Sequence, residues 1–148
     1  LNAAPDLPLD ETDAAWLRAK LRGVEAKREL LRAEGGTGSS SEMGELLGLT
    51  RQAVDKRRRN DRLLAVQTGS RGYRYPLWQV EKGESVFGLE KVLEILSGED
   101  PWMVLQFFVS ENRRLDDEKP VDLLYSQSPD ALERVLEAAK SYGEHGAD

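Results

Sequence analysis

The residues from Ser41 to Arg59, SEMGELLGLTRQAVDKRRR, constrain the fold more than any other part of this 148-residue chain. Gly44 supplies a bare position at which two short helices can cross closely. Gly48 follows four residues later, where a helix must end in a conformation that strains other residues. Thr50 is a good N-cap for a second helix. The spacing therefore predicts two short helices joined by a tight turn, which is the helix-turn-helix arrangement.

The side chains of this motif fall on two faces. Leu47, Leu49 and Val54 lie where they would fill the angle between the helices, which leaves a donor-rich face of the second helix outward. A recognition helix presents such a face to the major groove of DNA. The residues predicted to bind DNA here are Thr50, Arg51, Gln52, Asp55, Lys56, Arg58 and Arg59. The alternative is a solvated basic helix end, which favours the helix dipole and needs no ligand.

A hairpin is predicted directly after this helix, because two apolar runs flank the turn-rich segment from Thr68 to Gly72. A hairpin in this position is a wing, and a tip with arginine and tyrosine side chains can contact phosphate or enter a minor groove. The residues predicted to bind DNA from the wing are Arg71, Tyr73 and Arg74. The alternative is a hairpin that only covers the core, with Tyr75 and Trp78 buried.

Charge is divided unevenly along the chain, whose net charge is −6. Residues 51–80 hold eight Lys and Arg against two Asp, a local charge of +6, whereas residues 1–50 come to −3 and residues 81–148 to −9. Attraction to phosphate acts over a Debye length of about 8–10 Å in physiological salt. The acidic flanks therefore do not prevent a polyanion from binding to the basic segment.

A long helix is predicted before the motif, between Asp10 and Glu34. Its apolar residues follow one helical stripe: Leu17, Leu21, Val24 and Leu31. We expect this helix to pack within the subunit or against a second copy of the chain, although the stripe covers only about two heptads. The segment GGTGSSS then ends the helix, and Ser39 with Glu42 can form a capping box for the next one.

Beyond Gly83 the composition turns acidic and the periodicity is helical. The apolar residues of segment 102–109 surround their helix, so that helix must be buried on all sides or meet a partner. Pro120 and Pro129 can begin two further helices. The predicted fold is mainly α. A helix-turn-helix with a small β-hairpin wing occupies residues 1–82, and an all-helical C-terminal domain occupies residues 83–148.

Composition excludes several classes of site. The chain has no cysteine, so disulfides and cysteine-ligated metals are excluded, and its one histidine lies in a polar tail. We find no nucleophile with a base, no phosphate-binding glycine loop and no distinctive carboxylate cluster. We therefore expect no enzyme activity, no metal and no cofactor. The lack of a long apolar run or signal peptide predicts a cytoplasmic protein that does not contact membranes.

The C-terminal half resembles the toxin-binding domain of the Xre/MbcA/ParS antitoxins. The resemblance rests on NRRLDDEKPVDLL, residues 112–124, before a helix that ends near Tyr142 and Gly143. The residues that match the family motif are Asn112, Leu115, Pro120, Asp122, Leu123 and Leu124. The chain departs from the family in its N-terminal half and in SQSPD, where a glycine-rich centre is expected.

The resemblance implies a DNA-binding antitoxin that represses its own operon and neutralises a RES-type toxin, which consumes NAD. The residues then expected to contact the toxin or form an interface are Trp102, Phe107, Phe108, Asn112 and Tyr142. The alternative is a stand-alone regulator whose C-terminal helices only dimerise. A homodimer is expected in either case, because one helix-turn-helix reads one half-site of a DNA operator and segment 102–109 needs cover. RNA binding is a weaker alternative, since no aromatic platform for single strands is evident.

Overall fold

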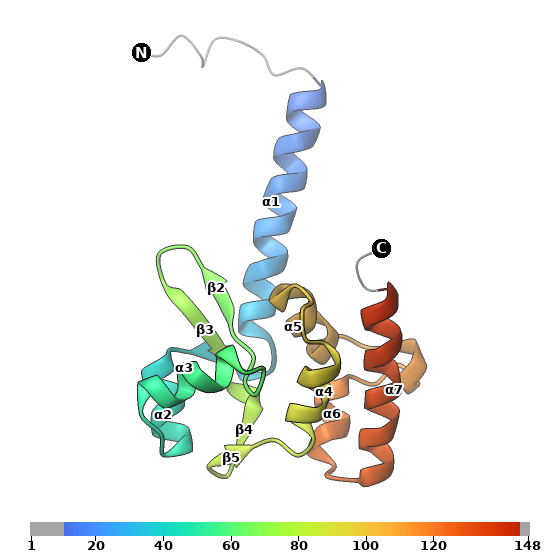
Figure 1. The fold of residues 1–148 in the computed structure, drawn as a ribbon. Helices are drawn as coiled ribbons and strands as arrows, with labels where there is room; N and C mark the ends of the chain where they lie inside the picture. Colours follow the sequence, from blue (N-terminus) through green and yellow to red (C-terminus); the bar gives the residue numbers. More distant parts are fainter. Residues whose placement is uncertain (1–10, 146–148) are drawn as a thin grey trace.

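The computed structural model describes residues 11–145 as a body of helices with small antiparallel sheets, from which the first helix projects (Figure 1). The α-helices of this part are α1 (Glu11–Arg32), α2 (Ser40–Leu47), α3 (Arg51–Arg59), α4 (Leu89–Ile95), α5 (Pro101–Val109), α6 (Pro120–Tyr125) and α7 (Pro129–His145). The strands are β1 (Thr37–Gly38), β2 (Val66–Thr68), β3 (Gly72–Pro76), β4 (Val80–Glu81) and β5 (Glu84–Ser85). Short 3-10 helices are η2 (Ala33–Gly35), η3 (Leu77–Gln79) and η4 (Arg113–Leu115). The predicted mainly α class is confirmed.

The starts of α2 and α3 are fixed by the caps that the sequence predicts. The Ser39 hydroxyl accepts a hydrogen bond from the Glu42 amide at 3.1 Å, and the Glu42 carboxylate accepts one from the Ser39 amide at 2.7 Å. This reciprocal pair is a capping box. The Thr50 hydroxyl accepts a hydrogen bond from the Ala53 amide at 3.1 Å and so caps α3. Both helices therefore begin where local side chains satisfy free backbone amides.

The turn between the two helices depends on its two glycines. A Cβ atom on Gly44 would lie 2.5 Å from the Leu49 carbonyl oxygen, so the chain can pass this close only over a glycine. Gly48 ends α2 in the left-handed region, with φ at 69°. Val54 of α3 is fully buried at the helix crossing. The structure confirms the predicted helix-turn-helix together with the role of its spacing.

The predicted wing is the β2–β3 hairpin, which extends away from α3 (Figure 1). Its register pairs Val66 with Arg74 and Thr68 with Gly72. On its other edge β3 pairs with β1, so the sheet order is β1-β3-β2. The sequence did not predict β1, because a strand of two residues carries no periodicity. This strand ties the segment before α2 to the wing.

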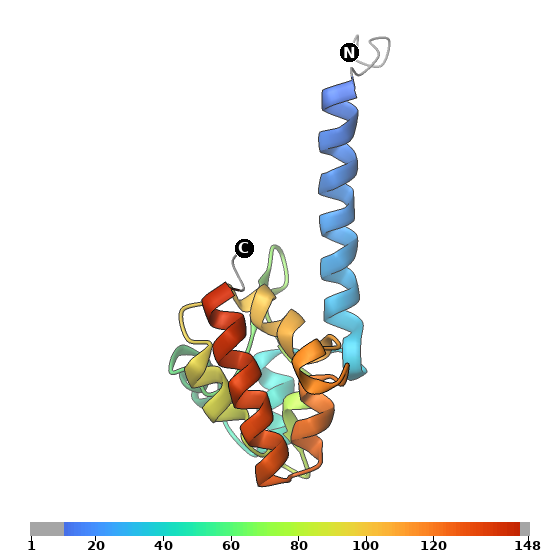
Figure 2. The same ribbon diagram turned by 90° about the vertical axis from the view of Figure 1, so that its right-hand side faces the viewer.

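The C-terminal helices pack around α5, whose apolar residues are covered by the subunit itself. The buried residues of α5 are Val104, Leu105, Phe107, Phe108 and Val109. Of the two alternatives predicted for this segment, burial within the subunit is the one that the structure shows, because helices α1 and α6 and the wing strand β2 pack against it. Helix α7 lies along α4 and α6, on the side of the body that faces the viewer in Figure 2.

One hydrophobic core spans both of the predicted domains. The rings of Trp78 and Phe108 lie 4.8 Å apart between centroids, and the Tyr125 hydroxyl donates a hydrogen bond to the Trp78 carbonyl at 2.6 Å. The boundary predicted at residues 82 and 83 falls in the turn of the small β4–β5 hairpin. Because the core continues across this turn, the boundary does not separate two independent cores.

Helix α1 meets the body only near its C-terminal end, and its N-terminal part stands clear of it (Figures 1 and 2). Leu30 and Leu31 pack against the core, whereas no residue of the helix is buried. Lys119 anchors the segment that follows α1, with its ammonium 3.0 Å from the Glu34 carboxylate. Within residues 11–145, no helix is long and apolar enough to cross a membrane.

The close approach at Gly44 generates a prediction on stability. Gly44→Ala should lower the free energy of unfolding by about 1–3 kcal/mol, because the added methyl group overlaps a backbone oxygen that cannot move without opening the turn. Urea unfolding followed by circular dichroism measures the change. Gly23→Ala in α1 is the matched control, since nothing lies within 4 Å of its Cβ and alanine favours a helix. Equal stability of wild type and Gly44→Ala would contradict the role given to this glycine.

Candidate nucleic-acid interface

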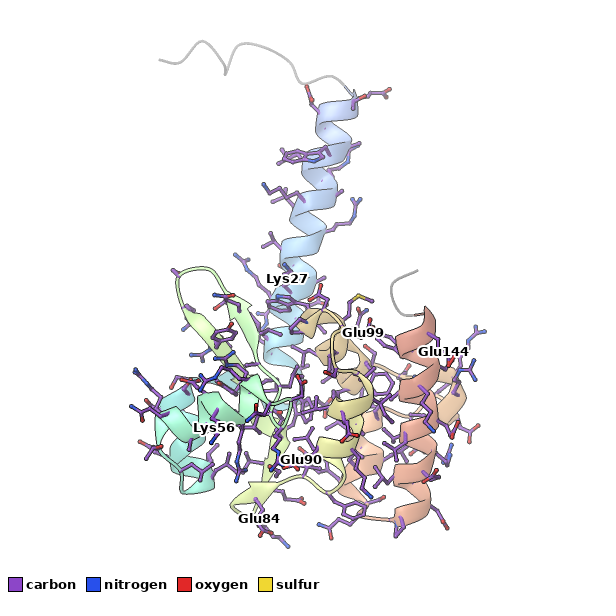
Figure 3. All side chains as sticks on the ribbon, viewed as in Figure 1. Lys27, Lys56, Glu84, Glu90, Glu99 and Glu144 are labelled. Carbon is purple, nitrogen blue, oxygen red and sulfur yellow. The ribbon has the colours of Figure 1, made fainter. Side chains whose placement is uncertain are left out.

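Helix α3 presents a row of exposed donors on its outer face. Gln52, Lys56 and Arg59 recur at spacings of four and three residues, so they lie on one side of the helix, and all three are exposed. Arg51 and the capping residue Thr50 are exposed at the start of the same helix. These five of the seven predicted residues of this helix are therefore accessible to a ligand. Figure 3 labels Lys56 on α3.

Asp55 was predicted to face DNA, but the structure turns it toward the protein. Its carboxylate accepts hydrogen bonds from the Tyr75 hydroxyl at 2.7 Å and from the Ser40 hydroxyl at 2.8 Å. Ser40 begins α2 and Tyr75 belongs to β3, so one side chain connects both helices of the motif with the wing. Asp55 is thus a residue that positions α3, and its use as a base contact is corrected.

Arg58 is likewise occupied within the protein. Its Nε donates a hydrogen bond to the Tyr75 hydroxyl at 3.2 Å, and its guanidinium lies 3.8 Å from the centre of the Tyr73 ring. The Asp55 carboxylate is 4.0 Å from the same Nε. A guanidinium stacked on an aromatic ring is held in a fixed orientation. Arg58 therefore joins α3 to the wing and is only partly available to a ligand.

The ionisation of this cluster supports its hydrogen bonds. Burial raises the pKa of Asp55, but the hydrogen bonds from Tyr75 and Ser40, together with the nearby Arg58 and Arg51 charges, outweigh it and hold the pKa below its ordinary value. Burial and the hydrogen bond to Asp55 raise the pKa of the Tyr75 hydroxyl, which keeps it protonated as a donor. At neutral pH the cluster therefore contains a carboxylate, a guanidinium and a neutral phenol.

The wing places its three predicted residues in different environments. Arg71 is exposed in the loop that joins the two strands, and Tyr73 is 37% exposed beneath the Arg58 guanidinium. Arg74 instead turns back to β1. Its Nη2 donates a hydrogen bond to the Thr37 carbonyl at 3.1 Å, and its Nε donates one to the Thr37 hydroxyl at 3.3 Å. The prediction of Arg74 as a fully free DNA contact is corrected, because two of its five N–H donors hold the sheet.

An open groove beside α3 adds basic residues that the sequence analysis did not include among the DNA contacts. Its lining contains Lys56, Arg57, Asn60 and Arg62. Arg57 was noted in the sequence only as an exception to the apolar pattern, and Asn60 and Arg62 follow the helix directly. The chain turns after α3, where the Arg62 amide donates a hydrogen bond to the Arg57 carbonyl. The residue spacing of the sequence does not indicate this turn. The groove extends the donor face of α3 by three side chains suited to phosphate.

Acidic residues lie mainly in the C-terminal half of the chain. Glu144 of α7 lies across the body from Lys56 (Figure 3), whereas Glu90 of α4 shares a pocket with Asn60 and Arg62. The local charges are +6 for residues 51–80 and −9 for residues 81–148. The surface formed by α3 and the wing is therefore basic, with acidic residues of α4 at its edge.

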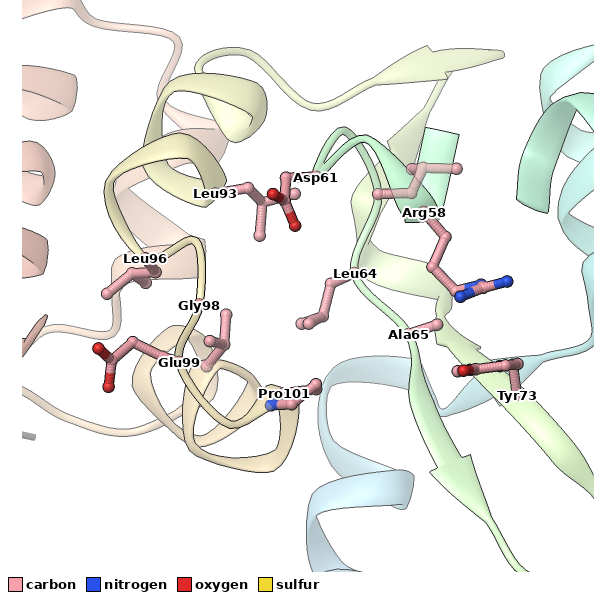
Figure 4. Close-up of a pocket in the computed structure, with 12 residues that line it drawn as sticks. Arg58, Asp61, Leu64, Ala65, Tyr73, Leu93, Leu96, Gly98, Glu99 and Pro101 are labelled. Atoms are coloured by element: carbon pink, nitrogen blue, oxygen red, sulfur yellow. The ribbon is translucent and has the colours of Figure 1, made fainter. Parts of the chain in front are cut away.

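A cavity of 190 Å³ lies between the end of α3, the wing and the start of α5 (Figure 4). Leu64, Leu93 and Pro101 form apolar parts of its wall, and Arg58 and Asp61 add charged groups. It is smaller than sites for drug-sized ligands, which are about 300–1,000 Å³. Within residues 11–145, no three potential metal-ligating side chains gather in one place.

Two of the five residues predicted to contact a toxin are buried, and the other three are half-buried. Phe107 and Phe108 are buried in the core, which removes them as contacts for a partner of the folded chain. Tyr142 packs on Phe107 and donates its hydroxyl to the Met103 carbonyl at 3.0 Å. The Asn112 side chain caps η4 through the Arg114 amide at 2.9 Å. Phe107 and Phe108 are therefore corrected from contact residues to core residues, whereas the contact role of Asn112 and Tyr142 stays a prediction.

Trp102 remains accessible in part. Its ring is half-buried and lies 5.0 Å below the Lys27 ammonium of α1. Of the motif residues shared with the antitoxins, Leu115, Pro120, Leu123 and Leu124 are buried, and Asp122 is exposed. The motif of this segment is therefore explained largely by packing.

A β-strand, two crossing helices and a hairpin define the N-terminal part as a winged helix-turn-helix fold. No protein-family model and no curated protein matches the sequence. Among solved structures, the chain is similar to the NMR structure of Rv2175c, with a TM-score of 0.54 and 24% sequence identity. The match covers 70% of this chain and 80% of that one. The similarity concerns the fold.

The Asp55 cluster generates a prediction on pH. The pKa of Asp55 is lower in the folded chain than its ordinary value, so its stabilisation is present above about pH 3.9 and is lost as pH falls through the lower folded pKa. Asp55→Asn should cost about 1–3 kcal/mol of unfolding free energy at pH 7, since it weakens charged hydrogen bonds. The difference from wild type should shrink in acid.

Urea unfolding at neutral pH and near pH 3 measures both values. Glu84→Gln, which removes an exposed carboxylate of β5, is the control and should change little at either pH. A cost for Asp55→Asn that stayed constant down to pH 3 would show that the carboxylate charge is not what the cluster uses.

Proposed function

We propose that the chain is a DNA-binding regulator in which α3 enters the major groove of a duplex and the wing contacts the flanking backbone. The observation that carries this proposal is the outward row of Gln52, Lys56 and Arg59 on a helix held in place by the helix-turn-helix packing. In such motifs the N-terminal part of the second helix reads base edges. Gln52 is suited to adenine, and the basic residues are suited to guanine or phosphate.

Two further features support the proposal. Arg71 at the wing tip and the groove residues Arg57 and Arg62 extend the basic surface beyond one helix, as contacts to two successive phosphate rows require. The internal bonds of Asp55 and Arg58 fix α3 against the wing. A helix that is already fixed in position loses less conformational entropy when its side chains bind DNA bases, and this favours binding.

Salt dependence and single substitutions test the proposal. Lys56→Ala should weaken binding to all duplexes and reduce the slope of log K against log salt by about 1, whereas Gln52→Ala should cost about 1–3 kcal/mol on the preferred sequence. An operator selected from random duplexes and titrated by fluorescence anisotropy provides both values. A dimer with six to ten phosphate contacts should have a total slope of about −5 to −9.

Lys91→Ala, an exposed change on α4, is the matched control and should bind as the wild type does. Arg58→Ala makes a poor probe, because it also removes the contacts with Tyr73 and Tyr75. A Lys56→Ala, Arg59→Ala double variant that bound with unchanged affinity and salt response would contradict the assignment of α3.

The antitoxin hypothesis is more specific than the DNA-binding proposal, and fewer of its predicted contact residues are accessible. Its candidates that are not buried are Trp102, Asn112 and Tyr142, since Phe107 and Phe108 lie in the core. It predicts that the full chain co-purifies with the protein encoded by the adjacent gene and rescues growth when that protein is toxic. Trp102→Ala should then weaken both effects, and Phe87→Ala, an exposed aromatic change before α4, should weaken neither. Absence of both co-purification and rescue would contradict the antitoxin hypothesis and favour a stand-alone regulator.

A further inference from the structure

The most exposed apolar surface of the described chain lies along the projecting part of α1. Seven large hydrophobic side chains of residues 11–145 are exposed, and four of them belong to this helix: Trp16 at 63%, Leu17 at 41%, Leu21 at 58% and Val24 at 43%. Scattered exposed hydrophobic residues need no explanation, but a contiguous row at helical spacing marks an interaction surface. Leu17, Leu21 and Val24 form such a row, and Trp16 lies about 100° around the helix from Leu17. The row forms the free flank of a helix that stands clear of the body (Figure 2).

The body stabilises only the C-terminal end of α1. Lys27 lies over the Trp102 ring, and Leu30 and Leu31 pack on the core. The residues before position 27 form more than half of this 22-residue helix. In proteins most of the stability of a helix comes from tertiary packing of its apolar face. The projecting part has no such packing within the subunit, so a partner along its apolar row would stabilise it.

The apolar row and the contact with the body are centred on different faces of the helix. At about 100° per residue, the centre of Leu17, Leu21 and Val24 lies about 90° around the helix from the centre of Lys27, Leu30 and Leu31. Leu31 continues the stripe of the row and packs on the core. A second helix can therefore lie along the row as far as Val24, before the stripe reaches the body. Under two-fold symmetry the two bodies then lie on opposite sides of the helix pair.

We propose that α1 pairs in parallel with α1 of a second copy of this chain, with Leu17, Leu21 and Val24 as its seam. These three residues occupy the d, a and d positions of a heptad pattern, and Ala14 occupies the preceding a position. The same face on both copies forms a closed, self-complementary interface. This inference goes beyond DNA binding and does not depend on it, because it is tested by the oligomeric state of the chain in the absence of DNA.

The charges beside the seam favour this partner and this direction. In the parallel pair Lys20 at position g faces Glu25 of the second copy at position e, and the contact occurs on both sides of the seam. Within one copy Glu25 lies 3.8 Å from Arg28 and 3.5 Å from Arg32, in exposed pairs that can exchange at little cost. The antiparallel register that stacks Leu17 on Leu21 instead brings the two Lys20 residues together and places Glu25 beside Glu11.

Cysteine cross-linking tests the parallel seam directly, because the chain has no cysteine of its own. In the full chain, Val24→Cys should form a disulfide-linked dimer on mild oxidation at micromolar concentration. Ala19→Cys, exposed on the opposite side of the same helix, is the control and should stay monomeric. Cross-linking that appeared only when Leu17→Cys and Leu21→Cys chains were mixed would show an antiparallel pair and overturn the proposed direction.

Sedimentation of the full chain tests the partner. Wild type should show a concentration-dependent dimer whose helical circular dichroism falls on dilution, and Leu21→Ser should be monomeric at concentrations where Phe87→Ser still dimerises. Lys20→Glu should weaken the dimer at least several-fold, and Lys20→Glu with Glu25→Lys should restore it. A wild type that stayed monomeric over the whole series and gave no Val24→Cys cross-link would overturn the proposal.

Discussion

The carboxylate of Asp55 is the group on which the arrangement of the basic face depends. It accepts hydrogen bonds from Ser40 of α2 and Tyr75 of β3 while it belongs to α3, so it fixes the three elements against one another. Hydrogen bonds to a charged group contribute about 1.5–3 kcal/mol, roughly twice as much as neutral ones. A negative charge on a helix otherwise rich in arginine is thus used to hold the helix, and the donors of Gln52 and Lys56 remain free to face outward.

A second constraint is the buried contact between the wing region and the C-terminal helices. Gln79 is fully buried, and its amide group pairs with the backbone of Leu64 at 2.6 and 2.9 Å. The neighbouring Trp78 packs on Phe108 of α5. The C-terminal helices, which belong to the acidic half of the chain, therefore pack against the region of the hairpin.

The features that the sequence predicted correctly are those with local causes. Gly44, Thr50 and the Ser39–Glu42 box act on residues no more than five positions away, so spacing alone indicates them. The wrong assignments involve partners that are distant in the sequence. Asp55 bonds to a residue 20 positions later, and Arg74 bonds to one 37 positions earlier. No periodicity indicates which outward-facing polar residue finds such a partner. The choice between burial and a partner for segment 102–109 likewise depended on elements that only the folded chain brings together.

The opposition of a basic face and an acidic flank gives this molecule a permanent electric dipole. In the field of a polyanion, a dipole experiences a torque as well as an attraction, and the torque acts before contact. On the proposed function, the chain approaches DNA with α3 and the wing leading and with Glu144 trailing, although its total charge of −6 is repelled. Orientations that turn the acidic C-terminal helices toward the DNA are then disfavoured. The charge division thus selects orientation during diffusion, ahead of any fit between surfaces.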